Sequence, residues 1–203
     1  MNRLTTLLAL AYVAIGATAQ QTAKEELKAN VYLSASNYLD YDRQLVVEPL
    51  TAAPKGYEPF YMSHYGRHGS RWLIGENEYS APMNILRDAQ RAGKLTAEGE
   101  ATLQKIEAFY PMTINRLGEL TSVGERQHHG IGRRMVQNFP EIFKAKNVPI
   151  DARSTVVIRC ILSMEAECEE LAAANPTARI HNDVSESFQY YLNQKREGRL
   201  KQQ

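Results

Sequence analysis

Apolar and polar positions alternate in short runs at some places in the chain and follow helical spacing at others. Residues 59–62 form a short alternating apolar run, which predicts a strand. Two further runs predict strands at 148–152 and 177–180. Helical spacing with start and stop signals predicts helices over 82–89, from Thr96 to Phe109, from Thr121 onwards, and from Arg153 to about Ala174. Residues 21–58 predict an irregular lead-in with one short helix around 22–30.

The predicted helix ends carry recognisable signals. Pro82 stands at a predicted start and Gly93 follows the end of the same helix. Thr96 and Thr121 each precede a helical pattern and are predicted N-caps. Glycines at 124, 130 and 132 lie inside the third helix, where each costs about 1 kcal/mol relative to alanine. We therefore expect this helix to pack closely against another backbone.

The first 20 residues differ in kind from the rest. A short positive start, an apolar run over residues 4–15 and the small-residue pattern Ala17-Thr18-Ala19 predict a secretory signal segment, cleaved near Ala19. An N-terminal membrane anchor is the alternative, but the run is shorter than a spanning helix requires. We expect an exported protein, periplasmic or extracellular, without stable membrane insertion, whose mature part is residues 21–203.

Composition narrows the function classes. The chain has 203 residues, of which 43% are apolar, and a formal net charge of +1, which suits one globular domain. Near-neutral charge argues against general nucleic-acid binding, so an anion site should be local. Cys160 and Cys168 lie in one predicted helix, roughly 12 Å apart by helical rise. That distance is too long for a disulfide, and both are predicted to be buried thiols.

The candidate chemistry lies in residues 63–71, S-H-Y-G-R-H-G-S-R, directly after the first predicted strand. Gly66 and Gly69 flank Arg67-His68, and Arg71 follows. Two guanidinium groups beside one imidazole suit a phosphoryl group, because arginine binds two oxygens at once and keeps its charge. The imidazole could attack phosphorus or carry a proton. Residues 153–155 present a second candidate anion site, at a predicted strand-to-helix junction with two hydroxyls.

These blocks together resemble the histidine acid phosphatases. Arg67-His68-Gly69-Ser70-Arg71 resembles their R-H-G-x-R signature, although the usual proline two residues later is Leu73. The patterns L-T-x-x-G and Q-H-x-x-x-G within residues 120–132, and R-S-T-x-x-x-R-T-x-x-S over 153–163 with Cys160 in place of its second threonine, follow in the family's order. The resemblance covers roughly residues 58–175. It implies an α/β fold of three layers, with a mostly parallel sheet flanked by helices.

The resemblance implies a mechanism and its residues. His68 would attack phosphorus and form a phosphohistidine, Arg67, Arg71 and Arg159 would hold the phosphate oxygens, and Arg153 would be mainly structural. No metal and no cofactor are implied. The family's proton donor comes from a distal His-Asp or His-Ala-Glu motif, which this sequence lacks. His181-Asn182-Asp183 is the nearest match, and a surface turn is the alternative for it. We therefore expect the chain to be the N-terminal portion of a longer phosphatase, with an incomplete sheet.

Several alternatives stay open. The spacing of His64 and His68 is that of a zinc pair on a helix, but Gly66 and the preceding strand disfavour it. The mutase-like branch of the superfamily is disfavoured by Arg71 and the later R-S-T block. An inactive phosphate-binding protein would keep the arginines without the acid. Among phosphorylated small molecules, the resemblance favours inositol polyphosphates, with five candidate extra contacts that could equally be surface charges: Lys55, Arg87, Arg91, Arg133 and Arg134.

Overall fold

The computed structural model describes residues 23–38 and 51–192. The chain divides into two compact units, residues 1–47 and 48–203. In the first unit, residues 23–29 are α-helical, close to the short helix predicted in the lead-in, and the 3₁₀ helix η1 spans Val31–Tyr38. The predicted signal segment lies outside the described residues. None of the described helices is both long enough and apolar enough to span a membrane.

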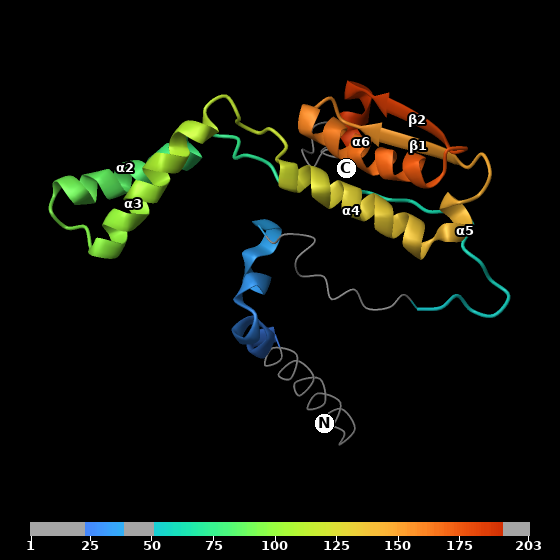
Figure 1. Ribbon diagram of the computed structural model, residues 1–203, viewed down its shortest axis with the longest axis horizontal. Helices are drawn as coiled ribbons and strands as arrows, with labels where there is room; N and C mark the ends of the chain where they lie inside the picture. Colours follow the sequence, from blue (N-terminus) through green and yellow to red (C-terminus); the bar gives the residue numbers. More distant parts are fainter. Residues whose placement is uncertain (1–22, 39–50, 193–203) are drawn as a thin grey trace, which may run out of the picture. The chain divides into compact units, whose positions relative to one another are not determined.

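The second unit contains the remaining elements, shown in Figure 1. In chain order these are α2 (Asn77–Arg91), α3 (Ala97–Phe109), η2 (Tyr110–Thr113), α4 (Ser122–Asn138), α5 (Pro140–Phe143), β1 (Pro149–Ser154), α6 (Ile158–Ala174), β2 (Arg179–Val184), η3 (Glu186–Phe188) and α7 (Gln189–Leu192).

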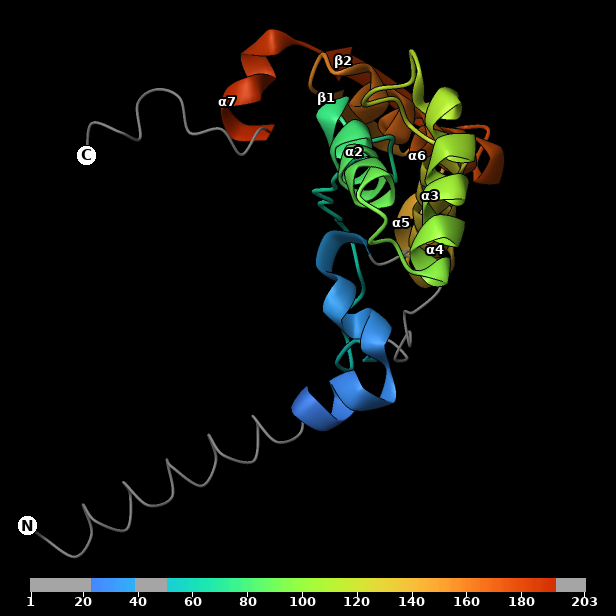
Figure 2. The same cartoon turned by 90° about the vertical axis from the view of Figure 1, so that its left-hand side faces the viewer.

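Helices α2 and α3 form a contacting pair, seen side by side in Figure 2. The predicted cap of α3 is confirmed, because the Thr96 side chain accepts a hydrogen bond from the Gly99 N–H. The predicted start of α2 at Pro82 is wrong, since the helix begins five residues earlier, at Asn77. Pro82 lies in the second turn, where its missing N–H removes one bond to the Glu78 carbonyl.

Strand β1, helix α6 and strand β2 form a parallel βαβ unit. Pro149 pairs with Arg179 and Ser154 with Val184 at the two ends of the ladder. Helix α6 contacts both strands and also α4, as Figure 1 shows. Buried apolar residues of α4, α5 and α6 form the core beneath the sheet: Met135, Val136, Phe143 and Leu171. This arrangement confirms an α/β fold, with an incomplete sheet of two strands in the described part of the chain.

Three sequence predictions need correction. The strand predicted at 59–62 is wrong, because these residues have no ladder partner and Phe60 is 93% exposed. Helix α6 begins at Ile158 and not at Arg153, because β1 continues through Ser154. The turn considered for residues 181–183 is also wrong, since all three belong to β2 and pair with residues 151–153.

Candidate active site

The Arg-His loop is held against the start of α4. Arg71 forms an antiparallel bridge with Leu120. On either side of it, the Trp72 N–H donates to the Glu119 carbonyl and the Thr121 N–H donates to the Ser70 carbonyl, both at 2.9 Å. Thr121 also caps α4, because its side chain accepts from the Gly124 N–H, as predicted. The same threonine therefore begins the helix and ties the loop to it.

Two glycines allow the loop and α4 to touch through their backbones. A Cβ atom on Gly124 would lie 2.3 Å from the Ser70 carbonyl oxygen, and one on Gly69 would lie 2.4 Å from the Gly124 carbonyl oxygen. No side chain fits at these separations. Further along α4, a Cβ on Gly132 would lie 2.9 Å from the Glu167 carbonyl oxygen of α6. The expected close approach to another backbone is confirmed at Gly124 and Gly132.

Two buried side chains fix the loop from below, and sequence reasoning did not single them out. The Gly69 N–H donates to Ser163 Oγ at 3.0 Å, and the Ser163 hydroxyl donates to the Arg159 carbonyl. Gln127 Oε1 accepts from the Ser70 N–H at 2.8 Å. Each is a matched position of one of the recognised sequence blocks, and that match was the only signal for it.

The departure from the family signature at Leu73 has a structural counterpart. The Leu73 N–H donates to the Tyr79 phenol oxygen at 2.6 Å, a bond that a proline could not make. Trp72 stacks on Phe109 with ring centroids 5.7 Å apart, and the Arg116 guanidinium lies 5.1 Å from the Trp72 ring centroid. In this chain, side-chain contacts fix the end of the loop at residues 72–73, where the family pattern has a proline.

His68 presents one defined nitrogen. Its Nδ1 lies 2.8 Å from the Gly69 carbonyl oxygen. A carbonyl can only accept, so Nδ1 carries the proton and, in the neutral ring, Nε2 keeps the lone pair. Burial lowers the pKa of His68 below its usual range, and although the Gly69 hydrogen bond opposes this, the charges of Arg159, Arg67 and Arg71 lower the pKa further. The neutral, nucleophilic form of His68 therefore persists to lower pH than it does in an ordinary histidine.

The three predicted arginines thus act on one imidazole. The Arg71 guanidinium donates to the Trp72 carbonyl at 2.8 Å, and the Arg159 guanidinium donates to the Gly118 carbonyl at 3.2 Å. In both side chains Nε is buried and has no hydrogen-bond partner among the described residues. Such donors are costly to leave unpaired, and an anion is the kind of ligand that could satisfy a guanidinium. The assignment of these residues to phosphate stays a prediction.

His68 and Arg67 line a cavity of about 250 Å³. The cavity lies between the segment 62–68, strand β1 and helices α4 and α6. Thr155 also lines it, is only 8% exposed, and has a hydroxyl without a hydrogen-bond partner in the described part of the chain. Neither hydroxyl of the predicted pair caps α6, whose N-cap is Val157 and has no side-chain cap. The correction follows from the longer β1, which keeps both hydroxyls ahead of the helix.

Other predicted residues lie elsewhere. His181 and Asp183 are on β2 and do not line the cavity; the His181 side chain is 75% exposed and lies 3.8 Å from Asp151. Arg87, Arg91 and Arg133 each pair with a carboxylate, of Glu107, Asp88 and Glu170 respectively. The two cysteines are free thiols on α6.

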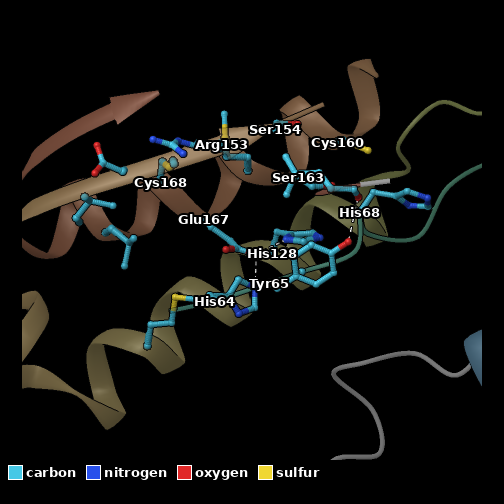
Figure 3. A pocket seen from close by; sticks show the side chains of 18 of the residues that line it. His64, Tyr65, His68, His128, Arg153, Ser154, Cys160, Ser163, Glu167 and Cys168 are labelled. Carbon is cyan, nitrogen blue, oxygen red and sulfur yellow. Dashed lines mark hydrogen bonds and ion pairs between the residues drawn. The ribbon is translucent and has the colours of Figure 1, made fainter. Parts of the chain in front are cut away.

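One cluster in the cavity was not predicted at all. Glu167 of α6 points toward His64 and His128, while His68 lies near Ser163, as Figure 3 shows. His64 therefore does not pair with His68, and its partner is a carboxylate from a distant helix. Among the described residues, no group of three or more His, Cys, Asp or Glu side chains has the arrangement of a metal site.

Two solved structures resemble part of this chain. One is a crystal structure of Bifidobacterium longum multiple inositol polyphosphate phosphatase in complex with inositol hexasulfate. Its sequence is 26% identical to this chain and the TM-score is 0.53. The match covers 64% of this chain and 28% of that one. The complex of the same protein with phosphate is 28% identical, with a TM-score of 0.52, and the match covers 62% and 26%.

The chain spans just over a quarter of the length of these solved chains. No protein-family model matches the chain, and no curated protein matches it significantly. The structural neighbours support a relationship with that group of phosphatases, in agreement with the resemblance seen in the sequence blocks.

Proposed function

We propose that this chain is a phosphoric monoester hydrolase of histidine acid phosphatase type that acts through a phosphohistidine on His68. One observation carries the proposal. The Nδ1–H of His68 donates to a backbone carbonyl, and the charges of three arginines lower the pKa of the same imidazole. The likeness to a solved inositol polyphosphate phosphatase supports the same class of reaction.

The proposed chemistry follows from this arrangement. His68 Nε2 attacks phosphorus, a nitrogen–phosphorus bond forms, and the bond from phosphorus to the leaving alcohol oxygen breaks. The departing oxygen takes up a proton. Water then attacks phosphorus, the nitrogen–phosphorus bond breaks, and inorganic phosphate leaves. Arg67, Arg71 and Arg159 stabilise the negative charge on the phosphoryl oxygens, a contribution that is commonly worth 10²–10³-fold in rate per donor, as an order of magnitude.

We further propose inositol polyphosphates as the substrate class, because a structural neighbour was crystallised with inositol hexasulfate. Three of the five basic residues considered as extra contacts are engaged with carboxylates, which weakens their case as substrate ligands. We also propose that the chain is exported, on the strength of its first 20 residues.

The test is phosphate release from inositol hexakisphosphate by the full chain at mildly acidic pH. We expect His68→Ala to lower kcat/KM by about 10⁴-fold or more, as loss of a nucleophile does elsewhere. His129→Ala is the matched control, because His129 pairs with Glu170 and does not line the cavity. Equal activity of His68→Ala and the unchanged chain would overturn the proposal. Folded protein that binds the substrate but never releases phosphate would indicate a binding function instead.

A further inference from the structure

The cavity contains a carboxylate shared by two imidazoles. Glu167 Oε1 lies 2.5 Å from His128 Nδ1 and 3.7 Å from His64 Nε2. The side chains of His128 and Glu167 are 4% and 14% exposed, whereas that of His64 is 37% exposed. A buried carboxylate is stable only when it is paired, and both of its ion-pair partners here come from other elements.

The cluster joins three parts of the site. His128 belongs to α4, Glu167 belongs to α6, and His64 lies four residues before His68 on a segment that has no strand partner. His64 and His68 line the same cavity. The cluster uses other side chains than the interactions that hold the loop at Gly69 and Ser70, although Gln127 and Ser163 are close along the same helices. Its contact with the segment that enters the loop is made through His64.

The ion pair between His64 and Glu167, called the anchor below, depends on pH because both side chains titrate. Burial raises the pKa of Glu167, but the hydrogen bond to His128 and the two nearby imidazoles outweigh it, so the pKa lies below its usual range. The nearby Glu167 carboxylate raises the pKa of His64 above its usual range, and burial only partly opposes this. Cys168, the next residue on α6, is also titratable, and burial raises its thiol pKa to about 11, so it stays uncharged.

The sign of the dependence follows. Below about pH 6.5 His64 is protonated and the imidazolium–carboxylate pair is complete. The charge attraction is lost as pH rises through the raised pKa of His64. In strong acid it is lost again, as pH falls through the depressed pKa of Glu167. The anchor is therefore strongest at mildly acidic pH.

We propose that Glu167 is a positioning residue that holds the segment carrying Arg67 and His68 against α4 and α6 through His64. The inference deepens the proposed function and rests on it wherever activity is the readout. Displacement of a reacting group by about 1 Å costs on the order of 10²-fold in rate. We therefore expect Glu167→Gln, which keeps the shape and removes the charge, to lower kcat/KM by about 10–10²-fold.

The test uses the full chain with Glu167→Gln, with Glu167→Asp as the conservative variant, and with Glu165→Gln as the matched control. Glu165 is the neighbouring carboxylate on α6 and accepts hydrogen bonds from Asn182, not from a histidine. An NMR titration of the ring protons should show that the pKa of His64 falls in Glu167→Gln, recovers in Glu167→Asp and is unchanged in Glu165→Gln. The alkaline limb of kcat/KM for inositol hexakisphosphate should move to lower pH in Glu167→Gln alone.

Two further measurements keep the inference falsifiable. In Glu167→Gln, the affinity for inorganic sulfate should fall at a pH at which His64 has lost its proton. This measurement reports on positioning even if the chain has no measurable activity. His64→Gln leaves the Glu167–His128 pair intact, so it replaces Glu167→Gln if that variant does not fold. If the pKa of His64 moves but neither the alkaline limb nor sulfate affinity follows, the cluster is structural only and the inference is wrong. If the pKa of His64 does not respond to Glu167, the anchor does not exist.

Discussion

Two segments with similar sequence patterns enter the candidate active site, and they are held in different ways. Residues 59–62 and 148–152 both predict strands that lead into an arginine-bearing block. Only the second becomes a strand, because β2 follows it through α6 and forms a parallel ladder with it. The first segment has no ladder, and its loop is fixed by Ser163, Gln127 and the contact between Gly69 and Gly124.

This difference shows that a short alternating pattern can indicate a strand but does not indicate whether a partner strand is present. A strand needs a neighbour for its backbone groups, and sequence shows that neighbour only when it is close along the chain. Where no neighbour is supplied, individual side chains must fix the backbone. The ladder side of the site should then depend on the core, and the loop side on single hydrogen bonds and close contacts.

The largest expected effect comes from breaking the ladder side. Leu171 of α6 is 6% exposed and packs in the core beneath the sheet. We expect Leu171→Ala to lower the free energy of unfolding by about 2–5 kcal/mol, because it leaves a cavity. Urea denaturation measures the change. A loss below about 1 kcal/mol would mean that the βαβ unit does not depend on this core.

A smaller effect should follow from separating the loop from α4. Gly124→Ala places a methyl group against the Ser70 carbonyl, so we expect a loss of about 1–3 kcal/mol and weaker phosphate binding. Gly99→Ala is the matched control, because Gly99 holds the same place after the cap of α3 and its new methyl group meets side chains, those of Leu95 and Thr96, and no other backbone. Equal effects of the two changes on phosphate affinity would contradict the account.

Removing one hydrogen bond should affect the loop more than the fold. Ser163→Ala leaves the buried Gly69 N–H without its acceptor, and we expect a cost of about 1–2 kcal/mol together with a fall in kcat/KM. Thr102→Ala is the control. Like Ser163, Thr102 has a hydroxyl that donates to a carbonyl of its own helix, but it lies on the exposed face of α3. Its loss should change the free energy of unfolding by less than about 0.5 kcal/mol. If Ser163→Ala matched this control in both stability and kcat/KM, the hydrogen bond from Gly69 to Ser163 would not be needed to hold the loop.

The smallest expected effect is on pH dependence. The neutral form of His68 is the nucleophile and its pKa lies below the ordinary 6.5, so the acidic limb of kcat/KM should fall below that pH. Arg159→Gln removes the largest of the three arginine effects, which should move the limb toward higher pH. The pH profiles of the two proteins provide the comparison, and a limb that moves toward lower pH would show that the sign is wrong.

Sequence predicted the parts of the fold that depend on neighbouring residues. The threonine caps of α3 and α4 and the strand β1 were found from local signals, and the parallel unit follows from their order. The starts of α2 and α6 were missed, because proline and hydroxyl residues are compatible with more than one position at a helix start. Residues 181–183 looked like a turn, since Asn and Asp favour turns, and the ladder with β1 overrode that preference.

The roles of the candidate site residues stay predictions. His68 and the three arginines were identified from blocks that resemble a known family, and the charges of these arginines lower the pKa of His68. The supporting residues were not identified, because Ser163, Gln127 and Glu167 act through contacts between residues 39 to 103 positions apart. No local pattern records such distances, so only a three-dimensional arrangement reveals them.

The central claim is that His68 becomes phosphorylated, and the most direct measurement is to trap that state. The full chain is mixed with phosphate-labelled inositol hexakisphosphate at mildly acidic pH, quenched in alkali, and the label is located by mass spectrometry of the peptides. The account predicts an acid-labile phosphate on the peptide that contains His68, absent from His68→Ala and retained in His129→Ala. Phosphate release without label on His68, in protein shown to be folded, would contradict the account.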